Sequence, residues 1–407
     1  LEDDLYVKMN ARGKALSDFE NFKAWLKKGL KDNSEIKFEN WPVKIDKEWL
    51  DIFWSERVDV ESVGKHYLAF FNTLALFKKL EAGSVTDDQL DGGLKELIHR
   101  LGSYEFIPTD FYEKNDVHNV VAINRAFALL ELLSNKEERN TLNQLIGEVW
   151  TDTFTNTDPF FKLDKNANKK FTSALLLHFP NLNLFHKVFV YAVLVFLRHK
   201  SYPIQSYTTE DKKNFRAWLR VARNIIYNSR IDDDVSYLRA IQSLNKLEKD
   251  AALNISEFLQ SQSFDKPWIS FFNQKQQFEE VQKSKLGGEW QETLHEAENH
   301  FYFYGQVGFI LELSKDGVTE NVDSFREYWH KLSQLFTPEH LDSNQYIVQR
   351  ALLANGDEDA LWMRHLTSNR RSFYRSVRSN SRQRDENWRY LFVNDEGNRL
   401  LLLKKLL

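Results

Sequence analysis

The residues whose types most clearly suggest a binding site lie between positions 364 and 389. Arginines are concentrated there, and the only acidic residues among them are Asp385 and Glu386. Arginine forks match the geometry of phosphate oxygens, and aromatic rings offer faces on which nucleic-acid bases stack. The aromatic residues of this stretch are Phe373, Tyr374 and Trp388. Its arginines, called the arginine region below, are Arg364, Arg370, Arg371, Arg375, Arg378, Arg382, Arg384 and Arg389. Contact with nucleic acid, a solvated basic loop and a surface paired with an acidic domain all fit this pattern.

A second candidate is an anion site formed by Asn10, Arg12, Gly13 and Lys14. A glycine turn that leads into a helix presents backbone N–H groups at the positive end of the helix dipole, and two cations stand beside this one. The alternative is a capped helix start with solvated charges, because the motif is much shorter than a phosphate-binding loop. Both readings stay open at this point.

Glu296, Glu298 and His300 have the residue types of a metal site or an acid–base pair. Residues i and i+4 share one face of a helix, so Glu296 and His300 are predicted to converge while Glu298 points elsewhere. Two ligands do not complete a metal site, since catalytic zinc usually takes three from the protein. We therefore predict a structural polar pair here and no bound metal.

The pair Glu339-His340 resembles the sequence around the first histidine of a nuclease module. No hydrophobic-x-Pro continuation follows them, and His365 with Asn369 lacks the hairpin and helix that would hold a metal against a scissile phosphate. We expect no catalytic residue in this chain. A metal-dependent nuclease that uses His340 is kept as an alternative.

Helices have to position these groups, because proline and glycine number only 7 and 15 in 407 residues and strand-like alternation rarely persists. The opening helix is the most legible. Ser17 and Glu20 form a capping box, and apolar residues then recur on one helical face. Further helices are predicted at about 46–58, 61–80, 87–101, 117–150, 168–199, 209–229, 234–260, 265–283, 289–312, 319–336 and 344–354. The predicted fold class is all-α, an irregular bundle of packed antiparallel helices in about two lobes.

Composition limits the partners and the compartment. The 55 basic and 59 acidic residues nearly balance, so any contact with nucleic acid has to come from a local patch. The sequence has no cysteine, which fits a reducing compartment and predicts a cytoplasmic protein. Its longest apolar run, Val188 to Leu197, is shorter than the roughly 20 residues that span a bilayer. We expect a buried helix there and no membrane partner.

The segment from Leu5 to Ser17 resembles the strand–turn–helix element N-x-R-G-x-x-L-[ST] that closes the ParB-like domain of GmrSD-type restriction proteins. Three segments further along the chain show weaker similarity to larger members of this family, in the same order. They are Trp218 to Asn224, Glu296 to His300 with Gly305, and Gln349 to Leu353 with Gly356 and Asp357. The resemblance therefore covers most of the chain, with its closest match at the start.

Membership of this family implies an upstream Asp-Gly-Gln-Gln-Arg motif tied to nucleotide-dependent activity and often a downstream His-Asn-His nuclease module. Neither motif is visible here, and Asp91-Gly92-Gly93 more simply separates two helices. We expect this chain to be a helical part of a longer protein. The predicted division is 1–30 as the trailing edge of a ParB-like domain, 31–205 as a first helical lobe and 206–407 as a second lobe with a basic C-terminal region.

The function that the resemblance implies is a helical scaffold or DNA-sensing region of a prokaryotic defence protein, without catalysis by this part. The parent protein would use a nucleoside triphosphate and a divalent metal, whereas this part would hold no cofactor. Its expected partners are DNA, the upstream ParB-like domain and a downstream nuclease module. The alternatives are a protein-interaction module that does not bind DNA and the nuclease that uses His340.

Overall fold

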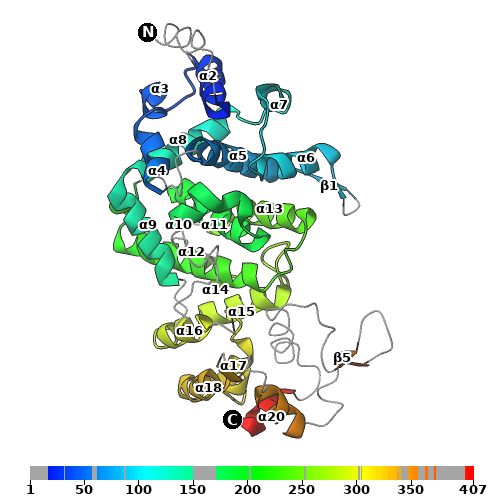
Figure 1. The fold of residues 1–407 in the computed structure, drawn as a ribbon. Helices are drawn as coiled ribbons and strands as arrows, with labels where there is room; N and C mark the ends of the chain where they lie inside the picture. Colours follow the sequence, from blue (N-terminus) through cyan, green and yellow to red (C-terminus); the bar gives the residue numbers. More distant parts are fainter. Residues whose placement is uncertain are drawn as a thin grey trace. The chain divides into compact units, whose positions relative to one another are not determined.

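A computed structural model gives the fold of the chain (Figure 1). The residues it describes are 17–31, 33–56, 62–86, 89–149, 171–200, 203–251, 254–300, 303, 305–337, 339–340, 347–355, 363–364, 371–372 and 399–407. Within them the predicted all-α fold is confirmed, since helices account for nearly all regular structure. The strands described form three antiparallel pairs of two residues each.

The described residues divide into two compact units. Unit 1 contains the described residues up to Phe258 together with 269–272, and unit 2 contains 259–268 and the described residues from 273 onward. This division differs from the predicted boundary at residue 205. The connection near residue 205 lies inside unit 1 because the carboxylate of Glu138, which is 3 % exposed, accepts hydrogen bonds from the backbone N–H groups of Ile204 at 2.8 Å and Gln205 at 3.1 Å.

Unit 1 is a stack of helices around one long central helix. Its elements are α2 (Asp18–Leu30), α3 (Trp41–Lys44), α4 (Glu48–Glu56), α5 (Val63–Ala82), β1 (Val85–Thr86), β2 (Gln89–Leu90), α6 (Gly92–Leu101), α7 (Thr109–Lys114), α8 (Val120–Ser134), α9 (Lys136–Val149), α10 (Phe171–Ser173), η1 (Ala174–His178), η2 (Phe179–Asn181), α11 (Leu184–Lys200), η3 (Ile204–Ser206), α12 (Thr209–Tyr227) and α13 (Asp234–Ala251). Helix α5 packs against α2, α4, α6, α8 and α13, and is apolar around most of its circumference, as a central helix must be.

The opening helix α2 begins where the sequence predicts. The side chain of Ser17 accepts a hydrogen bond from the backbone of Glu20, and the Glu20 carboxylate accepts one from the backbone N–H of Ser17 at 2.8 Å. This capping box satisfies N–H groups that have no partner inside the helix. Phe19, Phe22 and Leu26 are buried on the face that packs on α5. The capping box and the apolar face are therefore confirmed.

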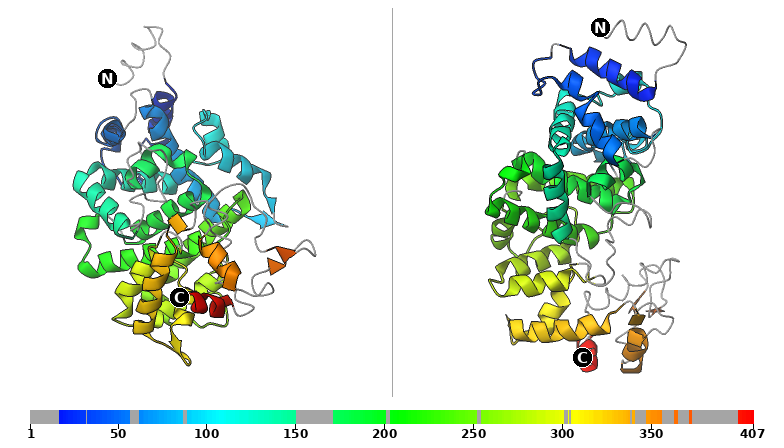
Figure 2. Two further views of the ribbon diagram at one scale, coloured as in Figure 1. Left: turned by 60° about the horizontal axis from the view of Figure 1, so that its bottom comes forward. Right: turned by 60° about the vertical axis from the view of Figure 1, so that its left-hand side comes forward.

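Helix α11 contains the long apolar run and lies in the core. Residues 188–193 and 195–197 are buried, and the helix packs against α12 and α13, which lie beside it in Figures 1 and 2. The prediction of a buried helix is confirmed. No helix among the described residues is long and apolar enough to cross a membrane.

Unit 2 has its own apolar core, built around Trp290, Phe303, Phe325 and Trp329. Its elements are the end of α14 (Ile255–Gln260), α15 (Gln274–Lys285), α16 (Trp290–Glu298), α17 (Gly308–Leu313), β3 (Lys315–Asp316), β4 (Thr319–Glu320), α18 (Val322–Leu335), α20 (Ile347–Asn355), β5 (Met363–Arg364), β6 (Arg371–Ser372) and α23 (Arg399–Leu406). Helix α18 packs on α16 and α17, and α23 packs on α17 and α20.

Several predicted helices are shorter than the sequence pattern suggests. The predicted helix 117–150 breaks into α8 and α9 at Asn135, whose side chain accepts hydrogen bonds from the backbone of Glu137 and Glu138 and so starts a new helix. The predicted helix 289–312 is interrupted between α16 and α17, where Gly305 has a φ of 82°. Asp91 caps α6 through the backbone of Gly93, but a strand pair rather than a helix precedes it.

Candidate functional site

The two most basic sequence candidates fall largely outside the described residues. Asn10, Arg12, Gly13 and Lys14 lie outside them, and so do six residues of the arginine region. These six are Arg370, Arg375, Arg378, Arg382, Arg384 and Arg389. The remaining two, Arg364 on β5 and Arg371 on β6, are direct backbone partners in an antiparallel pair.

The predicted pairing of Glu296 with His300 does not form. Helix α16 ends at Glu298, so residues 296 and 300 do not share a helical face. Glu296 is exposed, whereas Glu298 and His300 are each 1 % exposed. The neighbours of Glu298 and His300 are residues that the sequence pattern did not indicate.

Glu298 belongs to a buried cluster of one ammonium and three carboxylates, called the Lys283 cluster below. The Nζ atom of Lys283 lies 2.7 Å from Glu298, 2.5 Å from Glu280 and 3.1 Å from Glu279. It also donates to the backbone carbonyl of Gly305 at 3.1 Å. The side chain of Lys283 is 1 % exposed. One cation cannot neutralise three ionised carboxylates that are this deeply buried, so a proton is favoured on one of them.

Glu279 is the member of the Lys283 cluster on which that proton is favoured. Burial raises the pKa of Glu279, and its nearness to Glu280 adds to this effect, while Lys283 opposes it. The Glu279 carboxylate also accepts a hydrogen bond from the backbone N–H of Val307 at 2.8 Å, which ties α15 to the start of α17. A Cβ atom at Gly308 would lie 2.7 Å from the same carboxylate, so a larger residue there would force the Glu279 side chain to shift. The cluster therefore holds unit 2 together.

His300 and His340 each contact neighbouring residues of unit 2. The His300 ring stacks on Phe303 with centroids 4.5 Å apart and meets the edge of Trp329. Burial lowers the pKa of His300 to about 3, which keeps its ring neutral at physiological pH. The Nδ1 atom of His340 lies 3.0 Å from the carbonyl oxygen of Leu335, near the end of α18. Among the described residues no group of three or more His, Asp, Glu or Cys side chains is arranged to hold a metal.

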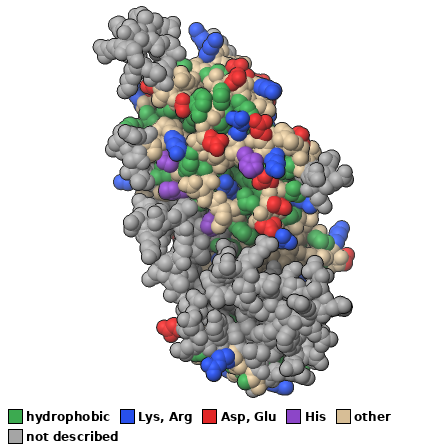
Figure 3. Space-filling model, turned by 45° about the vertical axis from the view of Figure 1, so that its right-hand side comes forward, with side chains coloured by type: hydrophobic (Ala, Val, Ile, Leu, Met, Phe, Trp, Pro, Cys, Tyr) green, Lys and Arg blue, Asp and Glu red, His purple; other side chains and the backbone are tan. Residues whose placement is uncertain are grey.

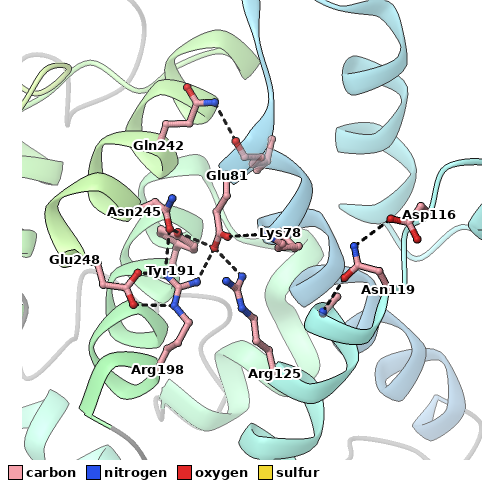
Figure 4. Close-up of polar contacts among 12 residues, drawn as sticks. Lys78, Glu81, Asp116, Asn119, Arg125, Tyr191, Arg198, Gln242, Asn245 and Glu248 are labelled. Carbon is pink, nitrogen blue, oxygen red and sulfur yellow. Dashed lines mark hydrogen bonds and ion pairs between the residues drawn. The ribbon is translucent and has the colours of Figure 1, made fainter. Parts of the chain in front are cut away.

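Unit 1 contains a pocket of about 720 Å³ with a charged end formed by three helices (Figure 4). Glu81 extends from α5, Arg125 from α8 and Arg198 from α11, and the two guanidinium groups point at the same carboxylate. The Nη1 atoms of Arg125 and Arg198 donate to Oε1 of Glu81 at 2.8 and 2.7 Å. The hydroxyl of Tyr191 donates to the same oxygen at 3.0 Å. These groups are called the Glu81 cluster below.

Helix α13 holds Arg198 in place through two of its side chains. Arg198 donates through Nε to Glu248 at 2.9 Å and through Nη2 to the side-chain oxygen of Asn245 at 3.1 Å. Arg125 makes no such second contact: its bond to Glu81 is its only hydrogen bond or ion pair with described residues. Arg198 is therefore fully engaged, whereas the Nε and Nη2 donors of Arg125 have no protein partner within the described part of the chain.

The Glu81 cluster keeps its carboxylate ionised. Burial alone would raise the pKa of Glu81, but Arg125 and Arg198 outweigh burial and hold the pKa below its usual value. Burial raises the pKa of the Tyr191 hydroxyl, so this group stays protonated and acts as a donor. The charged end of the pocket is thus a carboxylate held between two guanidinium groups, which is a rigid and strongly polar arrangement.

The rest of the pocket is mainly apolar. Leu74 and Phe77 stand about two turns and one turn before Glu81 on α5, and Val121 and Ala128 flank Arg125 on the same side of α8. Leu194 of α11 completes this part of the lining. Val121 is 49 % exposed, so an apolar side chain here faces open space rather than the core.

A short loop forms a further wall of the pocket and is fixed by one side chain. Asn124 of α8 donates to the carbonyl of Glu35 at 2.9 Å and accepts from the backbone N–H of Lys37 at 3.1 Å. These two hydrogen bonds connect the loop before α3 to α8, the helix that contains Arg125. The pocket wall is therefore built in and does not depend on a bound ligand.

Over the described part of the face drawn in Figure 3, basic and acidic side chains are intermixed with apolar ones. Comparison of the chain with protein-family models, with curated proteins and with solved structures finds no match. What the chain does is therefore inferred from its own residues and their geometry.

Proposed function

We propose that this chain is the helical region of a protein resembling GmrSD-type restriction systems, that it does no catalysis itself, and that it contacts DNA through residues 364–389. The observation that carries the family assignment is the start of α2. The segment from Leu5 to Ser17 resembles the family's strand–turn–helix element, and Ser17 is the residue that caps the helix following it. A helix start at the serine of N-x-R-G-x-x-L-S is what that element requires.

The absence of catalysis in this proposal rests on what the candidate catalytic groups do. Glu298 pairs with Lys283 in unit 2, and His300 stacks on Phe303 with its pKa lowered to about 3 by burial. His340 is engaged with the carbonyl of Leu335. A general acid or base needs access to its substrate, and Glu298 and His300 are each only 1 % exposed.

DNA contact is supported by the charge of the arginine region. Eight arginines stand there against two acidic residues, and like charges this dense repel one another unless anions compensate them. Two of these arginines, Arg364 and Arg371, occupy directly paired backbone positions of β5 and β6. Phosphate groups would supply the compensating charge, and the neighbouring aromatic residues would allow stacking.

Fluorescence anisotropy with a labelled duplex at several salt concentrations tests this proposal. Each phosphate contact releases condensed counterions, so log affinity should fall with log salt by about 0.9 per contact. Replacing Arg371, Arg375 and Arg378 together by alanine should flatten the slope by about two to three units. A matched control replaces the exposed lysines Lys47, Lys95 and Lys275, which form no ion pair with described residues, and should leave the slope nearly unchanged.

The competing functions give different results in the same assay. A protein-interaction module would show no binding to the duplex even at low salt, or a slope that the arginine variant leaves unchanged. A nuclease would cut the duplex once magnesium or manganese is added, and the cleavage would disappear in His340→Ala. Either outcome would replace the DNA-contact proposal, whereas salt-dependent binding without cleavage supports it.

A further inference from the structure

We propose that the pocket of unit 1 binds a small molecule that has an apolar body and a single carboxylate. The pocket, at about 720 Å³, lies within the range that ligand sites of soluble proteins usually occupy. Its lining combines a largely apolar wall with one concentrated polar end, which is the usual composition of such sites. The proposal is independent of DNA contact and concerns a different unit of the molecule.

The charge at the polar end calls for one negative charge. Lys78, Arg125 and Arg198 are cationic, whereas Glu81 and Glu248 are the carboxylates that face them. These five groups leave an excess of one positive charge. Glu35 and Lys37, which also line the pocket, add one charge of each sign and do not change the balance.

Arg125 is the group that would hold the carboxylate of the ligand. Arg198 already meets Glu81, Asn245 and Glu248, so its donors are used within the protein. Arg125 lines the pocket, its side chain is 25 % exposed, and it has no other hydrogen bond or ion pair with described residues besides Glu81. Its remaining donors, Nε and Nη2, match the fork geometry with which arginine binds a carboxylate.

A singly charged ligand fits this site better than a polyphosphate does. Nucleotides carry several negative charges and are normally held by several uncommitted cations or by a row of backbone N–H groups. Here one guanidinium, that of Arg125, has donors left over after its bond to Glu81, and the nearby Glu81 carboxylate would repel a second negative charge on the ligand. The ligand body would cover Val121 and contact Leu74, Phe77 and Leu194.

Binding of matched probes tests the proposal. The probes are 4-phenylbutyrate, octanoate and 2-naphthylacetate, each paired with its primary amide, and 2-naphthyl phosphate serves as the dianionic comparison. Ligand-observed NMR detects binding, and titration of the full chain gives Kd. We expect at least one carboxylate to bind about tenfold or more tightly than its amide, a preference typical of a charge-assisted hydrogen bond. We also expect 2-naphthyl phosphate to bind more weakly than 2-naphthylacetate.

Variants of the pocket then separate the polar contact from the apolar one. Arg125→Gln should remove the preference for carboxylate over amide, while leaving amide binding within about twofold. Val121→Glu, at a half-exposed position that the fold tolerates, should weaken every carboxylate probe by tenfold or more. Arg230→Gln is the control, because Arg230 is 84 % exposed, lies in unit 1 and does not line the pocket.

Three results would overturn the proposal. These are no binding by any probe, equal binding of carboxylates and amides, and a carboxylate preference that persists in Arg125→Gln. Circular dichroism melting of each variant shows whether the fold is retained. If Arg125→Gln fails to fold, Arg125→Lys keeps the charge but loses the fork, and should reduce the preference rather than abolish it.

Discussion

Both units of the molecule bury a cluster of charged side chains, and the two clusters are built with opposite signs. The Glu81 cluster of unit 1 places one carboxylate between two guanidinium groups, and it opens into a pocket. The Lys283 cluster of unit 2 places one ammonium among three carboxylates, and its side chains are at most 9 % exposed. The minority charge is therefore an anion in one unit and a cation in the other.

This difference decides what each cluster can do. A carboxylate with an excess of cations stays ionised and leaves a guanidinium donor for a ligand. A lone cation among carboxylates is fully occupied, and the excess acid is relieved by a proton rather than by a ligand. The first arrangement is suited to binding, whereas the second joins α15, α16 and the start of α17 within unit 2.

The largest expected effect is that of Lys283→Met. Removing the cation leaves three buried carboxylates without the ammonium group that opposes their charge, and breaking a buried ion pair in this way costs about 3–5 kcal/mol. Hydrogen exchange of residues 274–298, followed by mass spectrometry, should show the loss as faster exchange confined to unit 2. Adding Glu280→Gln and Glu298→Gln should recover part of it, because the carboxylates are then neutral. A Lys283→Met chain as well protected as the parent would mean that the cluster does not hold this unit together.

A smaller loss is expected for Glu81→Gln, about 2 kcal/mol at neutral pH, because Arg125 and Arg198 are each more than a fifth exposed and water compensates them in part. The pKa of Glu81 is lowered in the fold, so its contribution is present above its ordinary pKa of 4.5 and is lost as the pH falls through the lowered value. Denaturant unfolding between pH 5 and 7.5 should thus give a constant difference between variant and parent. A difference that grows or shrinks across this range would contradict the ionised state assigned to Glu81.

Glu279→Gln should behave in the opposite way over the same range. Its pKa is raised in the fold, so its contribution is complete below pH 4.5 and is lost as the pH rises through the raised value. Glutamine does not ionise, so the variant should not lose stability as the pH rises. Its stability relative to the parent should therefore increase by about 1.4 kcal/mol for each pH unit over which Glu279 titrates. Glutamine keeps an oxygen for the N–H of Val307, which makes the comparison clean. If the stability difference between Glu279→Gln and the parent did not change with pH, the proposed opposite behaviour of the two clusters would be wrong.

Much of the fold could be predicted from the sequence because its signals are local. The capping box of Ser17 and Glu20 fixes the start of α2, and the apolar run of α11 fixes a buried helix. The breaks within longer helical patterns were harder to predict. Asn135 and Gly305 interrupt an apolar periodicity that continues beyond them, so periodicity alone predicts one helix where the chain forms two.

The candidate sites were predicted less well because their partners are remote in sequence. The polar residues around His300 suggested a pair within one helix, whereas Glu298 meets Lys283 from α15 and Glu296 is exposed. Glu279, Glu280 and Lys283 have the spacing of surface ion pairs on a helix, and only the fold reveals that they are buried. Glu81 and Arg125 lie in different helices, 44 positions apart, and no spacing in the sequence indicates that they meet.

The remoteness of the Glu81 partners also bears on how unit 1 folds. Glu81 lies 44 positions from Arg125, 110 from Tyr191 and 117 from Arg198. Closing loops of this length costs chain entropy before any contact is gained, so these bonds should form after the nucleus has assembled from local helix pairs. Contacts that are absent from the transition state govern how fast a protein unfolds, not how fast it folds. The Glu81 cluster is thus expected to slow the unfolding of unit 1 while having little effect on its folding rate.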